Sequence, residues 1–318
     1  MFPILNAPLV VQTEIVTLMD APDLISLSLC SEAAYSFVKT HSLRKSTTME
    51  LHMIGGAIVL EAKFMSELDS EDVETVKFGS ERVPITRHPE CLHTYWEDRV
   101  HGLKTVIDYT SNVFGLPVAR LGSIRFQKDS YWMIDWINER QTTPLRTADL
   151  YNKQMFHDEE LAYILRNCHP SEYLTIQATV PPNFKFTSPF PNTNAIFIVE
   201  GEWITIDNLL TIDSTEFHIY RNSKLSSRDM NAFLKHWQAG GFPRLEYFRV
   251  GMASGIDFGQ ILGDGLEEHV EESTETRSYQ GRFFDKTFFG GHSIQNVNGH
   301  KATINCEANA MCMAVWKS

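Results

Sequence analysis

The chain has 318 residues, enough for a small module and a larger domain. Its hydrophobic content of 43% and aromatic content of 11% supply the apolar area that folded cores need. Lys and Arg total 28 against 40 for Asp and Glu, and the net charge of -12 repels a phosphate backbone, so we expect no nucleic-acid partner. The start lacks a basic signal-peptide region and no long apolar run follows, so we expect no membrane partner either.

Cysteine usage indicates a reducing compartment. An odd, sparse and scattered set argues for free thiols rather than a disulfide scaffold. No Asn-x-Ser/Thr glycosylation acceptor occurs. We therefore expect a cytoplasmic and/or nuclear protein. The cysteines are Cys30, Cys91, Cys168, Cys306 and Cys312.

The first 42 or so residues predict three short helices. Pro8 fits the first turn of helix one, where its missing N–H costs nothing. Ser31 offers an N-cap for helix three. The apolar residues at mainly helical spacing are Leu9, Val11, Ile15, Val16, Leu18, Leu24, Ile25, Leu27, Ala34, Phe37 and Val38. So much apolar surface on so few residues requires something to cover it.

A second domain begins near residue 46 with strand patterns. Residues 49–54 and 57–61 flank Gly55-Gly56 and predict a hairpin. Strands and helices then alternate at a spacing of roughly 20 to 30 residues, which is typical of a leucine-rich-repeat-like α/β array. The expected strands are 121–127, 148–153, 173–178, 195–199, 216–220 and 245–250, and the expected helices are 95–112, 130–139, 158–167, 204–211 and 226–238.

The helix near Ser226 is the best specified of these. Ser226 and Asp229 have capping-box spacing, and Gly240-Gly241 end the helix. Its apolar stripe, which we expect to pack on the sheet, comprises Met230, Phe233, Leu234 and Trp237. An acidic loop is expected over about 264–278, and Asn298-Gly299 predicts a hairpin before a last strand at 311–316.

No catalytic or cofactor motif is visible, so we expect no enzyme, no cofactor and no metal. His88, Cys91 and His93 bring potential zinc ligands together, but no second ligand cluster of matching spacing follows. Gly263-Asp264-Gly265 begins like a dinucleotide fingerprint but has Glu268 where the final glycine belongs, and it favours a loop.

Two segments resemble a known family in the expected order. Residues 2–31, from Phe2-Pro3-Ile4-Leu5-Asn6-Ala7-Pro8 to Leu27-Ser28-Leu29-Cys30-Ser31, resemble an F-box of the large nematode group. Residues 205–247, from Thr205-Ile206-Asp207-Asn208-Leu209-Leu210 to Pro243-Arg244-Leu245-Glu246-Tyr247, resemble the type 2 F-box-associated domain of that group. The chain departs from the family pattern at Ala7, where Leu is usual, and in lacking a clear Trp in helix three.

The resemblance implies an α+β protein, with a three-helix F-box over 1–45 and an α/β recognition domain over 46–318. It implies that the F-box binds a Skp-type adaptor, and through it a cullin, while the second domain holds an unknown target for ubiquitin-dependent degradation. By motif position, the adaptor-binding residues are Pro8, Leu9, Ile15, Leu24, Leu27 and Cys30. The alternative is a stand-alone protein-interaction scaffold whose N-terminal helices only cap the domain.

Overall fold

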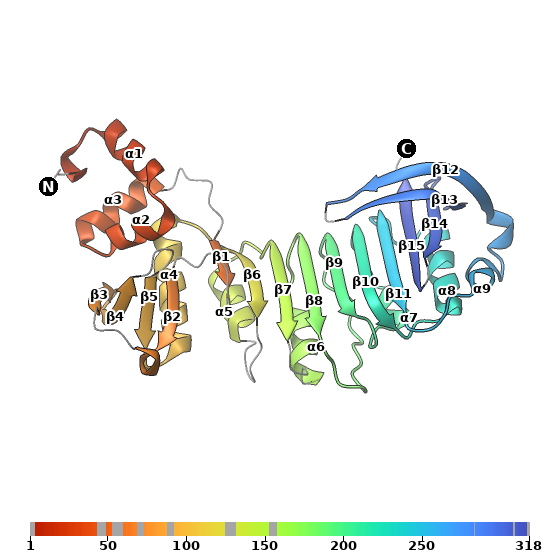
Figure 1. Cartoon of the computed structure of the whole chain (residues 1–318), viewed down its shortest axis with the longest axis horizontal. Helices are drawn as coiled ribbons and strands as arrows, with labels where there is room; N and C mark the ends of the chain where they lie inside the picture. Colours follow the sequence, from red (N-terminus) through yellow and green to blue (C-terminus); the bar gives the residue numbers. More distant parts are fainter. Residues whose placement is uncertain are drawn as a thin grey trace. The chain divides into compact units, whose positions relative to one another are not determined.

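The computed structural model describes residues 4–42, 49–52, 60–68, 73–87, 92–124, 132–152, 158–282, 284–307 and 309–316. Its chain divides into two compact units, Met1–Arg120 and Leu121–Ser318, and each is described by itself. N-terminal helices are followed by mixed α/β structure, so the α+β class expected from the sequence is confirmed (Figure 1).

The first unit begins with the three expected helices. Ser31 caps α3 through Ala34 N–H at 3.1 Å, as the pattern predicts. Asp20 caps α2 through Asp23 N–H at 2.9 Å, which was not predicted. Pro8 precedes the first helix rather than lying in its first turn. The elements are the short 3-10 turn η1 (Ile4–Asn6), α1 (Leu9–Leu18), α2 (Ala21–Ser28) and α3 (Glu32–Ser42).

A four-stranded sheet and a long helix complete the first unit. The strand order is β2-β5-β4-β3, with β2 parallel to β5 and the other pairs antiparallel. The elements are β1 (Met49–His52), β2 (Leu60–Phe64), η2 (Met65–Glu67), β3 (Glu74–Phe78), β4 (Glu81–Arg87), β5 (Leu92–Trp96) and α4 (Arg99–Phe114). Gly55-Gly56 lie outside the described residues, but the strand pairing predicted across them is wrong, because β1 and β2 belong to different sheets. The helix predicted from Tyr95 starts at Arg99, where Asp98 caps it, since Tyr95 and Trp96 are buried in β5.

In the second unit, strands and helices alternate as the sequence predicts. The strand order from β6, which crosses the boundary between the units, is β6-β7-β8-β9-β10-β11-β15-β14-β13-β12. Strands β7 to β11 run parallel, and the last four add antiparallel pairs. The elements are β6 (Val118–Ile124), α5 (Trp132–Arg140), β7 (Thr147–Asn152), α6 (Asp158–Asn167), β8 (Tyr173–Ala178), β9 (Ala195–Glu200), α7 (Ile206–Leu209), β10 (Glu216–Ser223), α8 (Ser227–Gln238), β11 (Tyr247–Met252), α9 (Phe258–Leu262), η3 (Glu267–His269), β12 (Val270–Gln280), β13 (Asp285–Gln295), β14 (Lys301–Glu307) and β15 (Ala310–Trp316).

The acidic loop expected over about 264–278 is wrong for most of its length. Residues 270–280 form β12, and η3 precedes it. Exposed glutamates suit an edge strand, because the partner strand β13 supplies the backbone hydrogen bonds whatever the side chains are. Composition indicated solvent exposure correctly and missed the strand.

Helix α8 follows its sequence pattern closely. The Ser226–Asp229 capping box forms, and Met230, Phe233, Leu234 and Trp237 are buried. The Phe233 ring stacks on Phe248 of β11 with centroids 4.0 Å apart. This face of the sheet is therefore the covered, helix-bearing side.

Candidate adaptor and target interfaces

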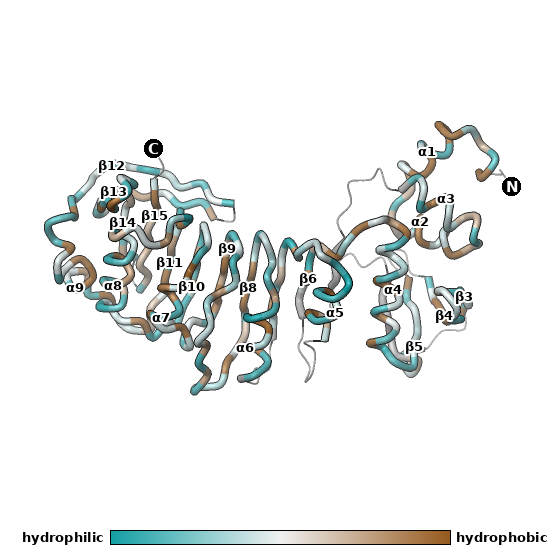
Figure 2. The backbone as a smooth tube through the Cα atoms, turned by 180° about the vertical axis from the view of Figure 1, so that it is seen from behind, coloured by the Kyte–Doolittle hydropathy of each residue, from teal (hydrophilic) through white to brown (hydrophobic). Residues whose placement is uncertain are grey.

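Helix α1 leaves its apolar side chains uncovered. The exposed fractions are 67% for Leu9, 73% for Val10 and 84% for Leu18, and Val16 is the buried member of the helix. Leu5 and Val11 are exposed as well, at 43% and 39%. Figure 2 shows hydrophobic stretches of the tube around α1. We call this set the α1 patch, and it has the character of a partner-binding surface, because monomeric proteins rarely leave large apolar side chains clustered in water.

Two of the six predicted adaptor-binding residues, Pro8 and Leu9, lie at the start of the α1 patch and are exposed. Ile15 is half-buried on the same helix. Val10 and Leu18, which are exposed, are not among the six predicted contacts. The available signal was the run Leu9-Val10-Val11, which puts apolar side chains on more sides of the helix than one core can cover.

Leu24 and Leu27 lie on the inner side of the helical module. Leu24 is fully buried in a core formed by Val16, Leu24, Phe37, Val38 and Val113, so its structural role is in packing. Leu27 is half-buried against the same core. Leu24 and Leu27 are therefore less accessible to a partner than Leu9, although all three belong to one short segment.

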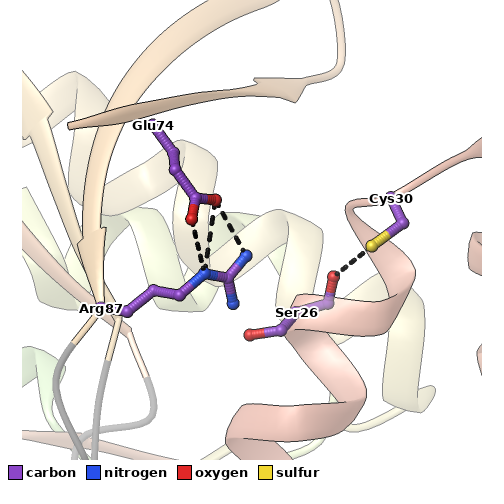
Figure 3. Close-up of polar contacts among 4 residues, drawn as sticks. All are labelled: Ser26, Cys30, Glu74 and Arg87. Carbon is purple, nitrogen blue, oxygen red and sulfur yellow. Dashed lines mark hydrogen bonds and ion pairs between the residues drawn. The ribbon is translucent and has the colours of Figure 1, made fainter. Parts of the chain in front are cut away.

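Cys30 follows α2 and is exposed. Its Sγ donates to the carbonyl of Ser26 at 3.3 Å, as Figure 3 shows. The same view includes the cross-strand ion pair of Arg87 with Glu74, 3.2 Å apart. Both of its side chains are about half exposed, so the pair adds little to stability.

The helical module is packed onto the rest of the first unit. Ser28 Oγ and Tyr109 Oη of α4 share a hydrogen bond of 2.9 Å, and burial raises the pKa of Tyr109 to about 12. Ile25 of α2 belongs to a core with Phe78 and Trp96 of the sheet. The predicted boundary near residue 45 thus falls inside one compact unit, because α2 and α3 share their cores with α4.

In the second unit, the parallel strands present a second face opposite α8. Strand residues alternate sides, and the register places Asp149, Thr175, Phe197, His218 and Arg249 in one row across β7 to β11. Each residue of this row lies one position from fully buried residues of the helix-covered face, such as Ile176 and Phe217. Thr175, Phe197 and Arg249 are only partly buried.

The turn between β12 and β13 folds back onto this row. Glu216 Oε1 accepts hydrogen bonds from Tyr279 Oη at 3.1 Å and from the backbone N–H of Arg282 at 2.8 Å. The Phe284 ring lies 3.9 Å from His218 and stacks on Phe197 at 5.5 Å, between centroids. Figure 1 shows the hairpin reaching back towards β9. His218 is buried as a result.

Burial has a direct electrostatic effect on His218. It lowers the pKa of His218 to about 3, and the positive charge of Arg249 adds to the shift. The imidazole is therefore neutral at physiological pH. Its Nε2 lies 3.9 Å from Glu216 Oε2.

Glu172, which precedes β8, joins two arginines. Arg146 Nε donates to it at 3.0 Å and Arg282 Nη2 at 2.7 Å, so two guanidinium groups share one carboxylate. These hydrogen bonds hold the pKa of Glu172 below its ordinary value. Both arginine side chains are 50% exposed against 20% for Glu172, so guanidinium is the charge that a partner meets here.

The zinc-like segment cannot be placed, because His88, Glu90 and Cys91 lie outside the described residues. Over the described ranges, no three His, Cys, Asp or Glu side chains gather into a metal site. Cys30, Cys168, Cys306 and Cys312 are free thiols. No helix in the described part combines the length and apolar character that crossing a membrane requires.

Two segments of the chain match known families. The F-box domain matches residues 7–46, which include α1, α2 and α3. The F-box associated family matches residues 185–250, which run from before β9 to β11. No curated protein and no solved structure matches the chain. An F-box implies binding to a Skp-type adaptor, and F-box adaptors are typically non-catalytic. The chain is thus an F-box protein that carries an F-box associated domain of type 2.

Proposed function

We propose that this protein is the substrate-recognition adaptor of a cullin-type ubiquitin ligase. The α1 patch carries the proposal: Leu9, Val10 and Leu18 are at least two-thirds exposed, within a segment that matches the F-box domain. Exposed apolar side chains of a helix bind a partner by entering apolar grooves on its surface. The adaptor that covers this patch connects the chain to a cullin scaffold.

The second unit holds the target protein. Its succession of parallel strands and helices supports a leucine-rich-repeat-like recognition domain, whose regular strand face offers a broad docking area. The mechanism is proximity, since holding a target near a ubiquitin-charged enzyme raises its effective concentration without acid–base chemistry by this chain. Such a function belongs in the cytoplasm or nucleus.

The test is adaptor binding by the full chain with a paired substitution, Leu9→Asp and Leu18→Asp. Both side chains are exposed, so the fold should be unaffected, while a charge in the apolar contact should weaken adaptor binding at least about a hundredfold. Val100→Asp is the matched control, because Val100 is an exposed apolar residue of α4 in the same unit. Equal adaptor binding by the pair and the wild type would contradict the proposal.

The stand-alone scaffold remains a second candidate, favoured by the shared cores of α2, α3 and α4. That reading requires Leu9, Ile15 and Leu27 to be covered by residues after 45. Leu9 is 67% exposed, which favours the adaptor. Failure of the wild-type chain to bind any Skp-type adaptor would reverse this preference.

A further inference from the structure

The open face of the second unit gathers arginine and aromatic side chains from distant parts of the sequence. We define the arginine–aromatic face as Arg146, Phe197, Tyr220, Arg249, Arg282 and Phe284. Resting on the proposed function, we propose that this face is the target-docking surface and that it takes an extended acidic segment with an apolar side chain between its carboxylates.

Charge is the first argument. Of the carboxylates that contact this face, Glu216 is almost completely buried and Glu172 is buried to four-fifths, whereas Arg146 and Arg282 are half exposed. Asp149 and Glu246 are partly buried as well. Asp285, which follows Phe284, is exposed. A chain of net charge -12 thus presents guanidinium groups at this place, which suits a carboxylate-bearing partner.

The aromatic side chains give the second argument. Phe197 and Phe284 stack in the middle of the face, and Tyr220 is 51% exposed at the far end. The guanidinium of Arg249 lies over the Tyr220 ring at 5.5 Å and is held by the Tyr220 carbonyl at 3.0 Å. Tyrosine and arginine are the residues most enriched among those that dominate binding energy, and these are already fixed in position.

Dimensions give the third argument. Arg146 directly precedes β7, and the register places Tyr220 four residues further along the strands than Glu216, on which the hairpin turn rests. At the rise of a β-strand that separation is about 13 Å, the length of about four extended residues. A carboxylate near Arg146 and Arg282, an apolar side chain near Phe197 and a second carboxylate near Arg249 fit that length.

Two fluorescein-labelled peptides test the proposal by fluorescence anisotropy with the full chain. In one peptide glutamates flank a single leucine, and in the other lysines replace the glutamates. We expect the acidic peptide to bind at least tenfold more tightly, with affinity falling as salt rises. Equal binding of the two peptides would overturn the proposal.

Substitutions in the arginine–aromatic face test whether the acidic peptide binds there. The double variant Arg146→Gln with Arg282→Gln keeps the backbone and Tyr279 contacts to Glu216, and it should weaken acidic-peptide binding at least tenfold. Arg228→Gln is the matched control, because Arg228 is an exposed arginine of α8 on the helix-bearing side. Should the double variant unfold, Tyr220→Ala at a half-exposed ring serves instead, with the same expectation. Unchanged affinity in a folded face variant would also overturn the proposal.

The adaptor-defective pair Leu9→Asp with Leu18→Asp separates this inference from the proposed function. It should bind the acidic peptide like the wild type. Wild-type adaptor binding without selective peptide binding refutes the docking face alone. Peptide binding by a wild type that binds no adaptor refutes the ligase role alone.

Discussion

Helices α1 and α8 are similar in length and rich in apolar residues, yet the apolar side chains of α8 are buried and most of those of α1 are exposed. In α8 the stripe of Met230, Phe233, Leu234 and Trp237 is completely covered by its own unit. In α1, Leu9, Val10 and Leu18 face solvent, and only Val16 is buried. Apolar composition therefore predicts a need for burial, while the rest of the fold determines whether the same chain or a partner covers the helix.

The largest expected effect is in the covered helix. Phe233→Ala should destabilise the second unit by about 3–5 kcal/mol, because it removes a fully buried ring stacked on Phe248 and leaves a cavity. Urea unfolding followed by tyrosine and tryptophan fluorescence measures this. Leu9→Ala, the matching truncation in α1, should change stability by no more than about 0.5 kcal/mol. A comparable loss in both would remove the contrast between the helices.

The second effect concerns adaptor affinity rather than stability. Leu18→Ala should weaken Skp-type adaptor binding by about 2 kcal/mol, roughly thirtyfold, if its exposed side chain becomes buried in the complex. Calorimetric titration measures this. Leu24→Ala is the comparison variant. Because Leu24 is fully buried, its truncation should lower the free energy of unfolding rather than act directly on adaptor binding. Weaker adaptor binding for Leu24→Ala without any loss of stability would show that the helical module rearranges on binding.

The third effect depends on pH and concerns a side chain that the hairpin covers. His218 has a pKa of about 3 in the folded chain against 6.5 when exposed, so the unfolded state binds more protons between these values. Stability from this group is therefore full above 6.5 and declines as pH falls, by up to about 1.4 kcal/mol per pH unit. The wild-type urea midpoint should approach that of His218→Gln as pH falls from 7 to 4. A constant difference would contradict the buried, neutral histidine.

The smallest effect is at a helix end. Ser226→Ala should cost about 1 kcal/mol, because it breaks the capping box of α8. Pro8, in the equivalent position before α1, makes no side-chain cap, so Pro8→Ala removes none. Urea midpoints compare the two. A larger loss at Pro8 than at Ser226 would mean that the entry to α1 is stabilised by contacts other than capping.

Much of the secondary structure of the second unit was predictable. Helix 158–167 and strand 173–178 were predicted with their observed bounds, because polar punctuation and regular apolar spacing agree there. Strand β12 was missed, since its pairing comes from β13 and its side chains are mostly acidic. The hairpin predicted around Gly55-Gly56 failed because a local turn signal carries no information about which sheet each strand joins.

The candidate sites were also predictable only in part. Apolar excess in the first 42 residues predicted a surface that requires covering, and Leu9, one of the predicted adaptor contacts, is exposed. Sequence spacing could not separate Leu24, which turns into the core, from Leu18, which does not. The arginine–aromatic face had no sequence signal, because Arg282 and Glu172 are 110 residues apart.

The local elements and the two family segments could be predicted from the sequence, since capping residues, helix-ending glycines and apolar periodicity act over a few neighbouring positions. Three features required the folded structure: which apolar helix is covered, the cores that α2 and α3 share with α4, and the hairpin turn that brings Arg282 and Phe284 onto the parallel strands. These features depend on burial and on contacts between residues far apart in the chain, which leave no pattern in the local sequence.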